Sequence, residues 1–365
     1  MLGSYSWNED LVPRDEFNIR HTKMRKLLEE NGWHSAFVYG DAREHGWLAW
    51  LTNYIPRMRW ALALFSLDRD PLLLVSMSSR DVPAMRRMTW LTDVRTGWEW
   101  KWFDSWVESA NAGRSATIGF DFMSAVLFNS IRKSVSDKLV LENADRAFAP
   151  LRNIHRPREI ALIKKSASIC SAAAERMLEA YDGGADVERA TLAGERLARG
   201  MAAQDVRTLV SRNGGLTLEP FRGKFDDRPK QLLAYIGVKY LGYWSEAFVS
   251  SKSLPWHYAK RSLDAMILEA KVGIPLARLA EKGRLALGEE QMHPIINGDF
   301  GARIGLSSDE GERIATGTAD CLRPNIAYSL HTGCLMQTHG GAILSATIIA
   351  KIDGTIETLM SSPGA

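Results

Sequence analysis

The sequence has few cysteines and no cluster of them. Three occur in 365 residues, and Cys170, Cys321 and Cys334 lie far apart without the C-x-x-C spacing. This scarcity excludes a disulfide framework and a thiolate zinc site as the basis of the fold. Free thiols are typical of proteins in a reducing compartment, so we expect the protein to be cytoplasmic.

Long hydrophobic runs and an excess of one charge are also missing. No apolar segment approaches the roughly 18 residues that a membrane-spanning helix needs, and the N-terminus lacks a basic region followed by an apolar core. The formal net charge is +3, with 46 basic and 43 acidic residues interspersed along the chain. These features predict neither a membrane nor a nucleic acid as partner.

Hydrophobic residues make up 45% of the 365, which is enough to form the cores of two domains. Helical and strand patterns alternate in residues 1–152, which predicts an α/β domain. A polar connector around Pro157 separates it from residues 153–365. The expected elements of the first domain are a helix over 14–31, strands over 35–39, 60–65, 71–75 and 116–120, and a helix over 124–138.

The second domain opens on a long amphipathic helix. Apolar residues keep a 3.6-residue period from Pro157 onward, and Gly183 and Gly184 supply a stop signal. We expect a second helix over 186–201, strands over 232–238 and 243–250 separated by Gly242, and helices over 263–271 and 275–287. The C-terminal segment predicts strands over 326–330 and 342–352, with Asp353 and Gly354 as a hairpin turn.

This order of elements resembles the pita-bread fold of creatinase, Xaa-Pro aminopeptidase, prolidase and methionine aminopeptidase. The resemblance rests on the segment Tyr235 to Glu246, the run Gly301 to Leu306, the strand entered at Pro324 and the final hairpin. The segment Trp50 to Tyr54 resembles one of the smaller creatinase-type domain. The resemblance implies an α/β chain, with an α+β pita-bread domain in its C-terminal part and a creatinase-type α/β domain in its N-terminal part.

The resemblance also implies that most of the family's metal ligands are replaced in this chain. In the metallopeptidase members, two aspartates, one histidine and two glutamates hold a pair of divalent metals. These positions correspond here to Tyr235, Glu246, Ala302, His331 and Ser345. Paired hard cations need bridging carboxylates, and only Glu246 supplies one, so the resemblance implies a site that binds no metal and uses no cofactor.

The side chains that replace the ligands have chemistry of their own. A carboxylate beside an imidazole orients its tautomer and raises its basicity, so Glu246 and His331 could activate water. Alternatively, His331 is a histidine of the core whose hydrogen bonds are made within the protein and which has no catalytic role. Tyr235 could donate to a developing oxyanion or act as an acid, and it could equally fill the space that metal and water would occupy.

Further residues are candidates for binding a substrate. We expect Arg303 to stabilise negative charge on the substrate. The resemblance implies that the small domain of one subunit covers the partner's pocket in a homodimer. A surface ion pair, an ordinary loop or a solvated strand face would explain several of the candidates equally well. The predicted substrate-binding residues are Arg303, His339, Glu219, Arg222, Arg57, Arg59, Tyr243 and Trp244.

Three functions follow from this interpretation. The first is a metal-independent hydrolase of a carbon–nitrogen bond in a small amide, amidine or lactam, as in creatinase. The second is a lyase, since the same base could remove a proton beside a leaving group. The third is a non-catalytic domain that binds a peptide or small ligand, as in some chromatin-associated pita-bread proteins. An open cavity at His331 would favour catalysis, and a pocket closed by Tyr235 and Trp244 would favour the third.

Overall fold

The chain divides into two compact units in the computed structural model, which describes residues 6–135, 138–222 and 231–365. Unit 1 comprises Met1–Ile154, and unit 2 comprises His155–Ala365. The sequence predicts this boundary between residues 152 and 153.

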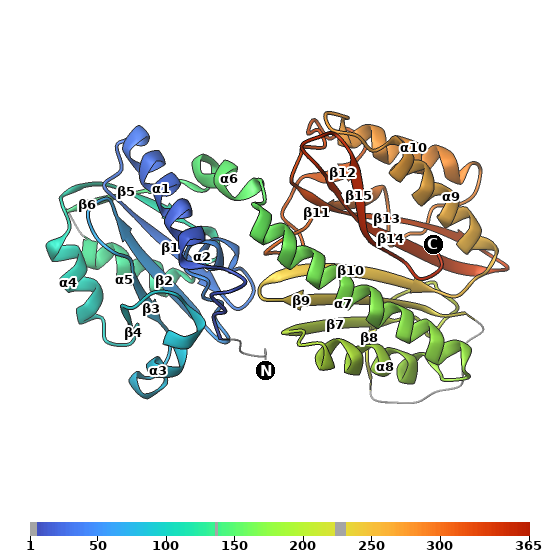
Figure 1. Ribbon diagram of the computed structural model, residues 1–365, viewed down its shortest axis with the longest axis horizontal. Helices are drawn as coiled ribbons and strands as arrows, with labels where there is room; N and C mark the ends of the chain where they lie inside the picture. The colour runs from blue at the N-terminus through green and yellow to red at the C-terminus, as the bar shows by residue number, and fades with distance from the viewer. Residues whose placement is uncertain (1–5, 136–137, 223–230) are drawn as a thin grey trace. The chain divides into compact units, whose positions relative to one another are not determined.

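Unit 1 is built on a six-stranded mixed sheet with the strand order β4-β3-β2-β1-β5-β6 (Figure 1). Every residue of β1 is buried, as expected for a strand covered on both faces. The strands are β1 (Ser35–Asp41), β2 (Trp60–Ser66), β3 (Leu72–Val75), β4 (Val94–Thr96), β5 (Gly113–Ile118) and β6 (Leu139–Asn143). The helices are α1 (Arg14–Asn31), α2 (Gly46–Thr52), α3 (Val82–Met85), α4 (Lys101–Ser109), α5 (Ala125–Val135) and α6 (Asp145–Asn153).

The described residues of unit 2 form four helices, and the sequence explains how two of them begin. In α7 (Pro157–Asp182), proline occupies the first turn, and the Glu159 carboxylate accepts a hydrogen bond of 2.9 Å from the backbone N–H of Arg156. In α8 (Val187–Gly200), Asp186 caps the first turn through the N–H of Arg189. The other two are α9 (Leu254–Glu269) and α10 (Leu276–Leu287).

One predicted helix is wrong in its start. The apolar period indicates a helix over 263–271, whereas α9 already begins at Leu254. Ser253 caps it through the backbone N–H of Trp256, and Pro255 stands in its first turn. A serine with a proline two residues later is a signal for the start of a helix. The apolar period alone does not reveal it.

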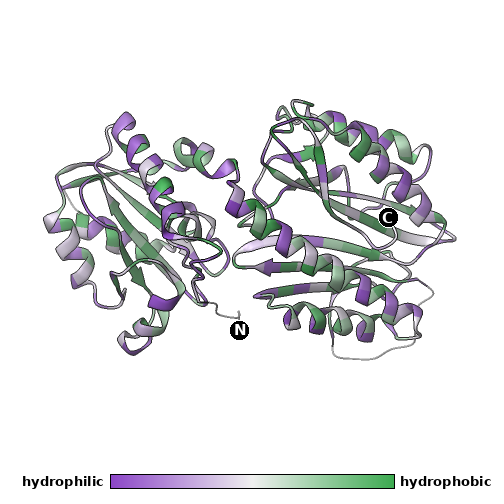
Figure 2. Cartoon of the chain, viewed as in Figure 1, coloured by the Kyte–Doolittle hydropathy of each residue, from purple (hydrophilic) through white to green (hydrophobic). Residues whose placement is uncertain are grey.

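Unit 2 contains two sheets, each covered by a helix pair (Figure 1). Helices α7 and α8 cover the four-stranded sheet β10-β9-β7-β8, and α9 and α10 cover the five-stranded sheet β12-β11-β13-β14-β15. The strands are β7 (Asp205–Val210), β8 (Glu219–Pro220), β9 (Leu233–Tyr240), β10 (Tyr243–Ser250), β11 (Asp299–Arg303), β12 (Arg313–Ala315), β13 (Ala327–Met336), β14 (Gly340–Ala350) and β15 (Ile356–Ser361). Figure 2 shows these strands largely hydrophobic and the helices mixed, which is the pattern of layers packed on a core.

The two sheets of unit 2 meet along β10 and β14. The backbone N–H of Phe248 donates to Ser345 Oγ at 2.9 Å, and Ser250 Oγ donates to the carbonyl of Ile343 at 2.9 Å. These bonds fix β10 beside the five-stranded sheet, so that side chains of β10 can reach those of β13. None of the helices in the described part of the chain combines the length and apolar character that crossing a bilayer demands.

Candidate active site

The site begins with the tight hairpin that joins β9 to β10. Leu241 and Gly242 form its turn, and both have positive φ, of 45° and 93°. The resulting antiparallel register places Glu246 opposite Gly237. A side chain at position 237 would start 2.9 Å from the Tyr235 phenol oxygen. The glycine therefore leaves room for the Tyr235 ring to lean toward Glu246 on the neighbouring strand.

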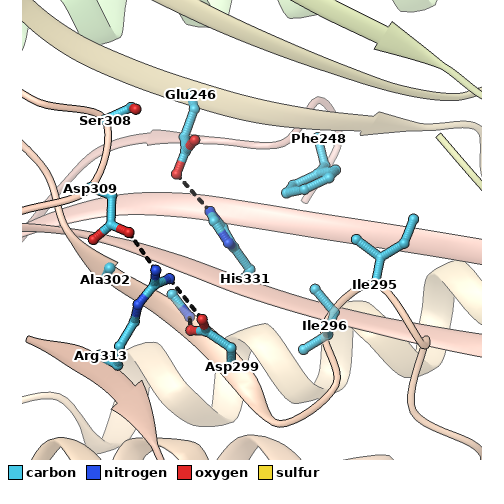
Figure 3. Close-up of a pocket in the computed structure, with 11 residues that line it drawn as sticks. Glu246, Phe248, Ile295, Ile296, Asp299, Ala302, Ser308, Asp309, Arg313 and His331 are labelled. Atoms are coloured by element: carbon cyan, nitrogen blue, oxygen red, sulfur yellow. Dashed lines mark hydrogen bonds and ion pairs between the residues drawn. The ribbon is translucent and has the colours of Figure 1, made fainter. Parts of the chain in front are cut away.

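Glu246 is the centre of a short hydrogen-bond chain. Tyr235 Oη donates to Glu246 Oε2 at 2.7 Å. His331 Nε2 lies 2.9 Å from Glu246 Oε1 (Figure 3). The hydroxyl of Ser329 lies 2.9 Å from the same imidazole nitrogen. The Phe248 ring meets the His331 ring edge to face, with centroids 5.2 Å apart, and this contact restrains the imidazole.

The protonation states of these groups follow from their surroundings. Burial by itself would raise the pKa of the Glu246 carboxyl, but the neighbouring His331 and the hydrogen bonds that the carboxylate accepts hold it below its ordinary value. Burial, together with the Glu246 charge, raises the pKa of the Tyr235 phenol well above its ordinary value. Near neutral pH the site therefore pairs an ionised carboxylate with a neutral phenol.

An ionised Glu246 also selects the tautomer of His331. Because the carboxylate only accepts hydrogen bonds, Nε2 must carry the proton that it shares with Glu246. The lone pair of the neutral ring is then on Nδ1, which accepts no hydrogen bond from the residues that the structure describes. His331 keeps 18% of its side chain exposed. The arrangement provides an oriented imidazole with one basic nitrogen free.

A cavity of about 290 Å³ opens beside this pair. Its wall is apolar at Phe248, Ile295 and Ile296, and ionic on the other side of His331 (Figure 3). The remaining lining residues are Glu246, Asp299, Gly301, Ala302, Ser308, Asp309 and Arg313. The volume suits a small molecule, and the oriented imidazole stands between its apolar and ionic walls.

Solved structures with the same architecture include a prolidase, an X-Pro aminopeptidase and the N-terminal domain of a FACT complex subunit. Prolidase from Pyrococcus horikoshii superposes with a TM-score of 0.78 at 16% identity, over 94% of this chain and 98% of that one. X-Pro aminopeptidase from Thermotoga maritima gives 0.78 at 18% identity, over 94% and 98%. The N-terminal domain of a FACT complex subunit from chickpea gives 0.65 at 12%, over 94% and 96%. The chain has the pita-bread fold.

Sequence comparison adds nothing to this structural likeness, because no protein-family model and no curated protein sequence matches the chain. At these identities the likeness establishes the fold alone. The predicted fold class, α/β with a pita-bread domain, is confirmed. The function of the cavity depends on the residues that line it and not on the fold.

The residues at the pita-bread metal positions do not fit a divalent metal pair. Glu246 is already shared between Tyr235 and His331, and Ala302 contributes only a methyl group to the cavity. Ser345 Oγ accepts the backbone N–H of Phe248 and is buried. Within residues 6–135, 138–222 and 231–365, no group of three or more His, Cys, Asp or Glu is placed to hold a metal ion.

Two of the predicted substrate-binding residues are held by buried partners. Side chains alternate along a strand, so Arg303 points away from the face on which Ala302 lines the cavity. Its guanidinium lies 2.9 Å from Glu312 and 3.4 Å from Glu310. The phenol of Tyr243 donates to Glu159 on α7 at 2.8 Å. Neither residue is among those that line the cavity.

Trp244 and His339 also have surroundings of their own. The Trp244 ring is buried, with the Arg207 guanidinium 4.3 Å and Lys239 Nζ 5.0 Å from its centroid. Burial lowers the pKa of Lys239 to about 8. His339 is exposed in the turn between β13 and β14, where its Nδ1 lies 2.8 Å from the Thr338 hydroxyl. The tryptophan does not close the cavity.

The remaining predicted residues lie on other elements. Glu219 on β8 accepts a hydrogen bond of 3.0 Å from Arg212, and Arg222 lies 3.9 Å from the same carboxylate. Arg57 and Arg59 precede β2 in unit 1, and the Arg59 guanidinium lies 4.9 Å from the ring centroid of Trp98. Their contacts with a substrate, and the homodimer, stay predictions.

The sequence interpretation overlooked several residues of the site. Ser329 and Phe248 stand two residues from His331 and Glu246 on the same strands, so strand alternation could have identified both. Asp299, Asp309 and Arg313 lie at strand ends and in a loop, where sequence spacing does not fix how side chains converge. Only the folded chain brings these three to the cavity.

The Tyr235→Phe variant tests the hydrogen-bond chain through stability. We expect its free energy of unfolding at pH 7 to fall by about 1–3 kcal/mol, because the Glu246 carboxylate stays buried with one donor fewer. The folded pKa of Glu246 lies below its unfolded value of about 4.3, so this contribution is present above that pH and is lost as the pH falls through the folded pKa.

Urea unfolding at pH 7 and at successively lower pH measures this difference. The loss should shrink in acid, whereas Tyr240→Phe on the same strand should show no such pH dependence. An equal loss at every pH would mean that the phenol contributes packing and not a hydrogen bond to a carboxylate.

Proposed function

We propose that the protein is a metal-independent hydrolase of a carbon–nitrogen bond in a small amide, amidine or lactam. One observation carries the proposal: the Glu246 carboxylate, hydrogen-bonded to His331 at 2.9 Å, lines an open cavity together with that imidazole. A histidine that merely filled a vacated ligand position would be packed shut. Buried polar groups are costly unless they are paired, and this pair is both ordered and accessible to a ligand.

The chemistry needs only the side chains of the site. His331 Nδ1 removes a proton from a water molecule as the water oxygen attacks the carbonyl or amidine carbon. The imidazolium that forms is stabilised by the Glu246 carboxylate through the Nε2 proton. The same proton then passes from Nδ1 to the nitrogen of the breaking carbon–nitrogen bond, which leaves as an amine or ammonia and returns the imidazole to its starting state.

Tyr235 supports this reaction by holding the Glu246 carboxylate. Its hydroxyl proton is directed at Glu246 Oε2, at 2.7 Å, so we assign it as a positioning residue and not as the donor to an oxyanion. A neutral phenol keeps the carboxylate ionised and turned toward His331. A fold by itself does not decide between catalysis and ligand binding. The open cavity beside Glu246 and His331, the catalytic dyad of this proposal, favours the hydrolase.

The proposal is tested by a screen of small amides, amidines and lactams. The purified chain is incubated with each compound, and products are followed by mass spectrometry together with release of ammonia, amine or urea. We expect at least one compound to gain the mass of one water across a cleaved carbon–nitrogen bond. A product that loses the leaving group without gaining water would indicate elimination instead, and binding without turnover would indicate a ligand-binding domain.

A further inference from the structure

The ionic wall of the cavity consists of two aspartates with an arginine between them. Arg313 Nη1 lies 2.7 Å from Asp299 Oδ2, and Arg313 Nη2 pairs with Asp309 (Figure 3). All three line the same cavity as Glu246 and His331. The wall is therefore part of the space that a substrate of the proposed hydrolase would fill.

The cavity carries an excess of negative charge. Its lining contains three carboxylates, those of Glu246, Asp299 and Asp309, and one guanidinium, which leaves a formal charge of −2 when His331 is neutral. A concave site with charge of one sign concentrates ligands of the other sign. The lining thus disfavours a substrate carboxylate and favours a cationic group.

The guanidinium of Arg313 is displaceable. The side chains of Arg313, Asp299 and Asp309 are 51%, 42% and 46% exposed. Ion pairs this exposed add little stability, so little is lost when the arginine turns to solvent. Arg313 is the first residue of β12, a three-residue strand at the edge of the five-stranded sheet. An ammonium or amidinium group of a ligand could take its place between the carboxylates.

The opposite wall suits a different kind of group. Phe248, Ile295 and Ile296 are apolar, and Figure 3 shows them across His331 from the two aspartates. Strand β11 also contributes Gly301, which has no side chain, and Ala302, which has only a methyl group, so the cavity stays open beside the imidazole. A ligand that spans the cavity would place its middle at the reactive nitrogen.

We propose that the cavity selects a small substrate with an apolar group on one side of the scissile carbon–nitrogen bond and a cationic group on the other, the cation being held by Asp299 and Asp309. Arg313 occupies this cation subsite until the substrate displaces it. The identity of the ligand as a substrate rests on the proposed function, whereas its binding needs no turnover. The subsite is therefore testable on its own.

Calorimetric titration with three ring compounds tests the subsite. Benzylammonium, benzyl alcohol and benzoate share the apolar ring and differ in charge, and none contains an amide. We expect benzylammonium to bind about tenfold more tightly than benzyl alcohol, and benzoate to bind most weakly, since the wall offers two charged acceptors. The preference should decrease as salt is added, because the wall is partly exposed.

Three substitutions locate the effect. Asp299→Asn and Asp309→Asn keep the shape and remove the charge, so each should weaken benzylammonium binding about three- to tenfold. Arg313→Gln removes the competitor and should strengthen the same binding about threefold. Asp264→Asn on α9, an exposed aspartate paired with Lys260, is the matched control and should change nothing. Thermal unfolding checks that each variant is folded.

Two results would overturn the subsite. One is benzoate binding most tightly and losing its affinity in Arg313→Gln, which would make the arginine an anion receptor. The other is equal binding of all three compounds. Failure of the hydrolase is a separate outcome: a chain that cleaves no amide but prefers benzylammonium keeps the cation subsite, and one that cleaves only neutral or anionic amides without that preference loses it.

Discussion

The His331→Ala variant should lose about 10²–10⁴-fold in turnover of an amide found in the screen, because the oriented imidazole is the general base in our account. The loss should fall on kcat, with KM within a few fold of the wild-type value, since the imidazole acts on water and not on the resting substrate. Steady-state kinetics at saturating and limiting substrate separate the two.

The matched control is His257→Ala. His257 is an exposed residue of α9 in the same unit, and its replacement should leave kcat and KM unchanged. Circular dichroism and thermal unfolding confirm that both variants keep the fold. If His331→Ala retained wild-type turnover while folded, the base would have to be another group, and the assigned role of the dyad would be wrong.

Glu246→Gln is the second substitution with a large expected effect. A glutamine amide can donate to His331 Nε2, which favours the tautomer with the proton on Nδ1 and removes the lone pair that the reaction needs. We expect kcat to fall about 10²–10³-fold while substrate binding persists, because the shape of the side chain is kept. Kinetics combined with calorimetric binding of benzylammonium measure both quantities.

Glu246→Asp completes this test. A shorter carboxylate still selects the productive tautomer but reaches the imidazole less well, so its turnover should lie between those of the wild type and the glutamine variant. A glutamine variant as active as the wild type would show that the carboxylate does not control the tautomer. Equal losses for aspartate and glutamine would point to a purely steric role.

Much of the architecture is readable from the sequence because it depends on local patterns. The 3.6-residue apolar period and the first-turn proline define α7, and the glycine turn defines the β9–β10 hairpin. Both predictions are confirmed. The start of α9 is one exception, because its capping serine precedes the apolar period that indicates the helix.

The site is only partly readable for a different reason. Tyr235, Glu246 and His331 converge because regular strands hold them in register, and the register of a hairpin follows from its turn and its apolar pattern. The Arg303 side chain lies on the face of its strand opposite to the cavity, because neighbouring residues on a strand face opposite sides. The cation subsite combines a strand end, a loop and an edge strand, and no local pattern places such side chains together.

Metal independence is the central claim, and metal removal tests it most directly. Turnover of the screened amide is measured before and after exhaustive chelation, again after adding Mn²⁺, Co²⁺ or Zn²⁺, and the metal content per chain is determined by mass spectrometry. We predict far less than one equivalent of metal and the same turnover in every sample. Turnover abolished by chelation and restored by one of the metals would contradict the account.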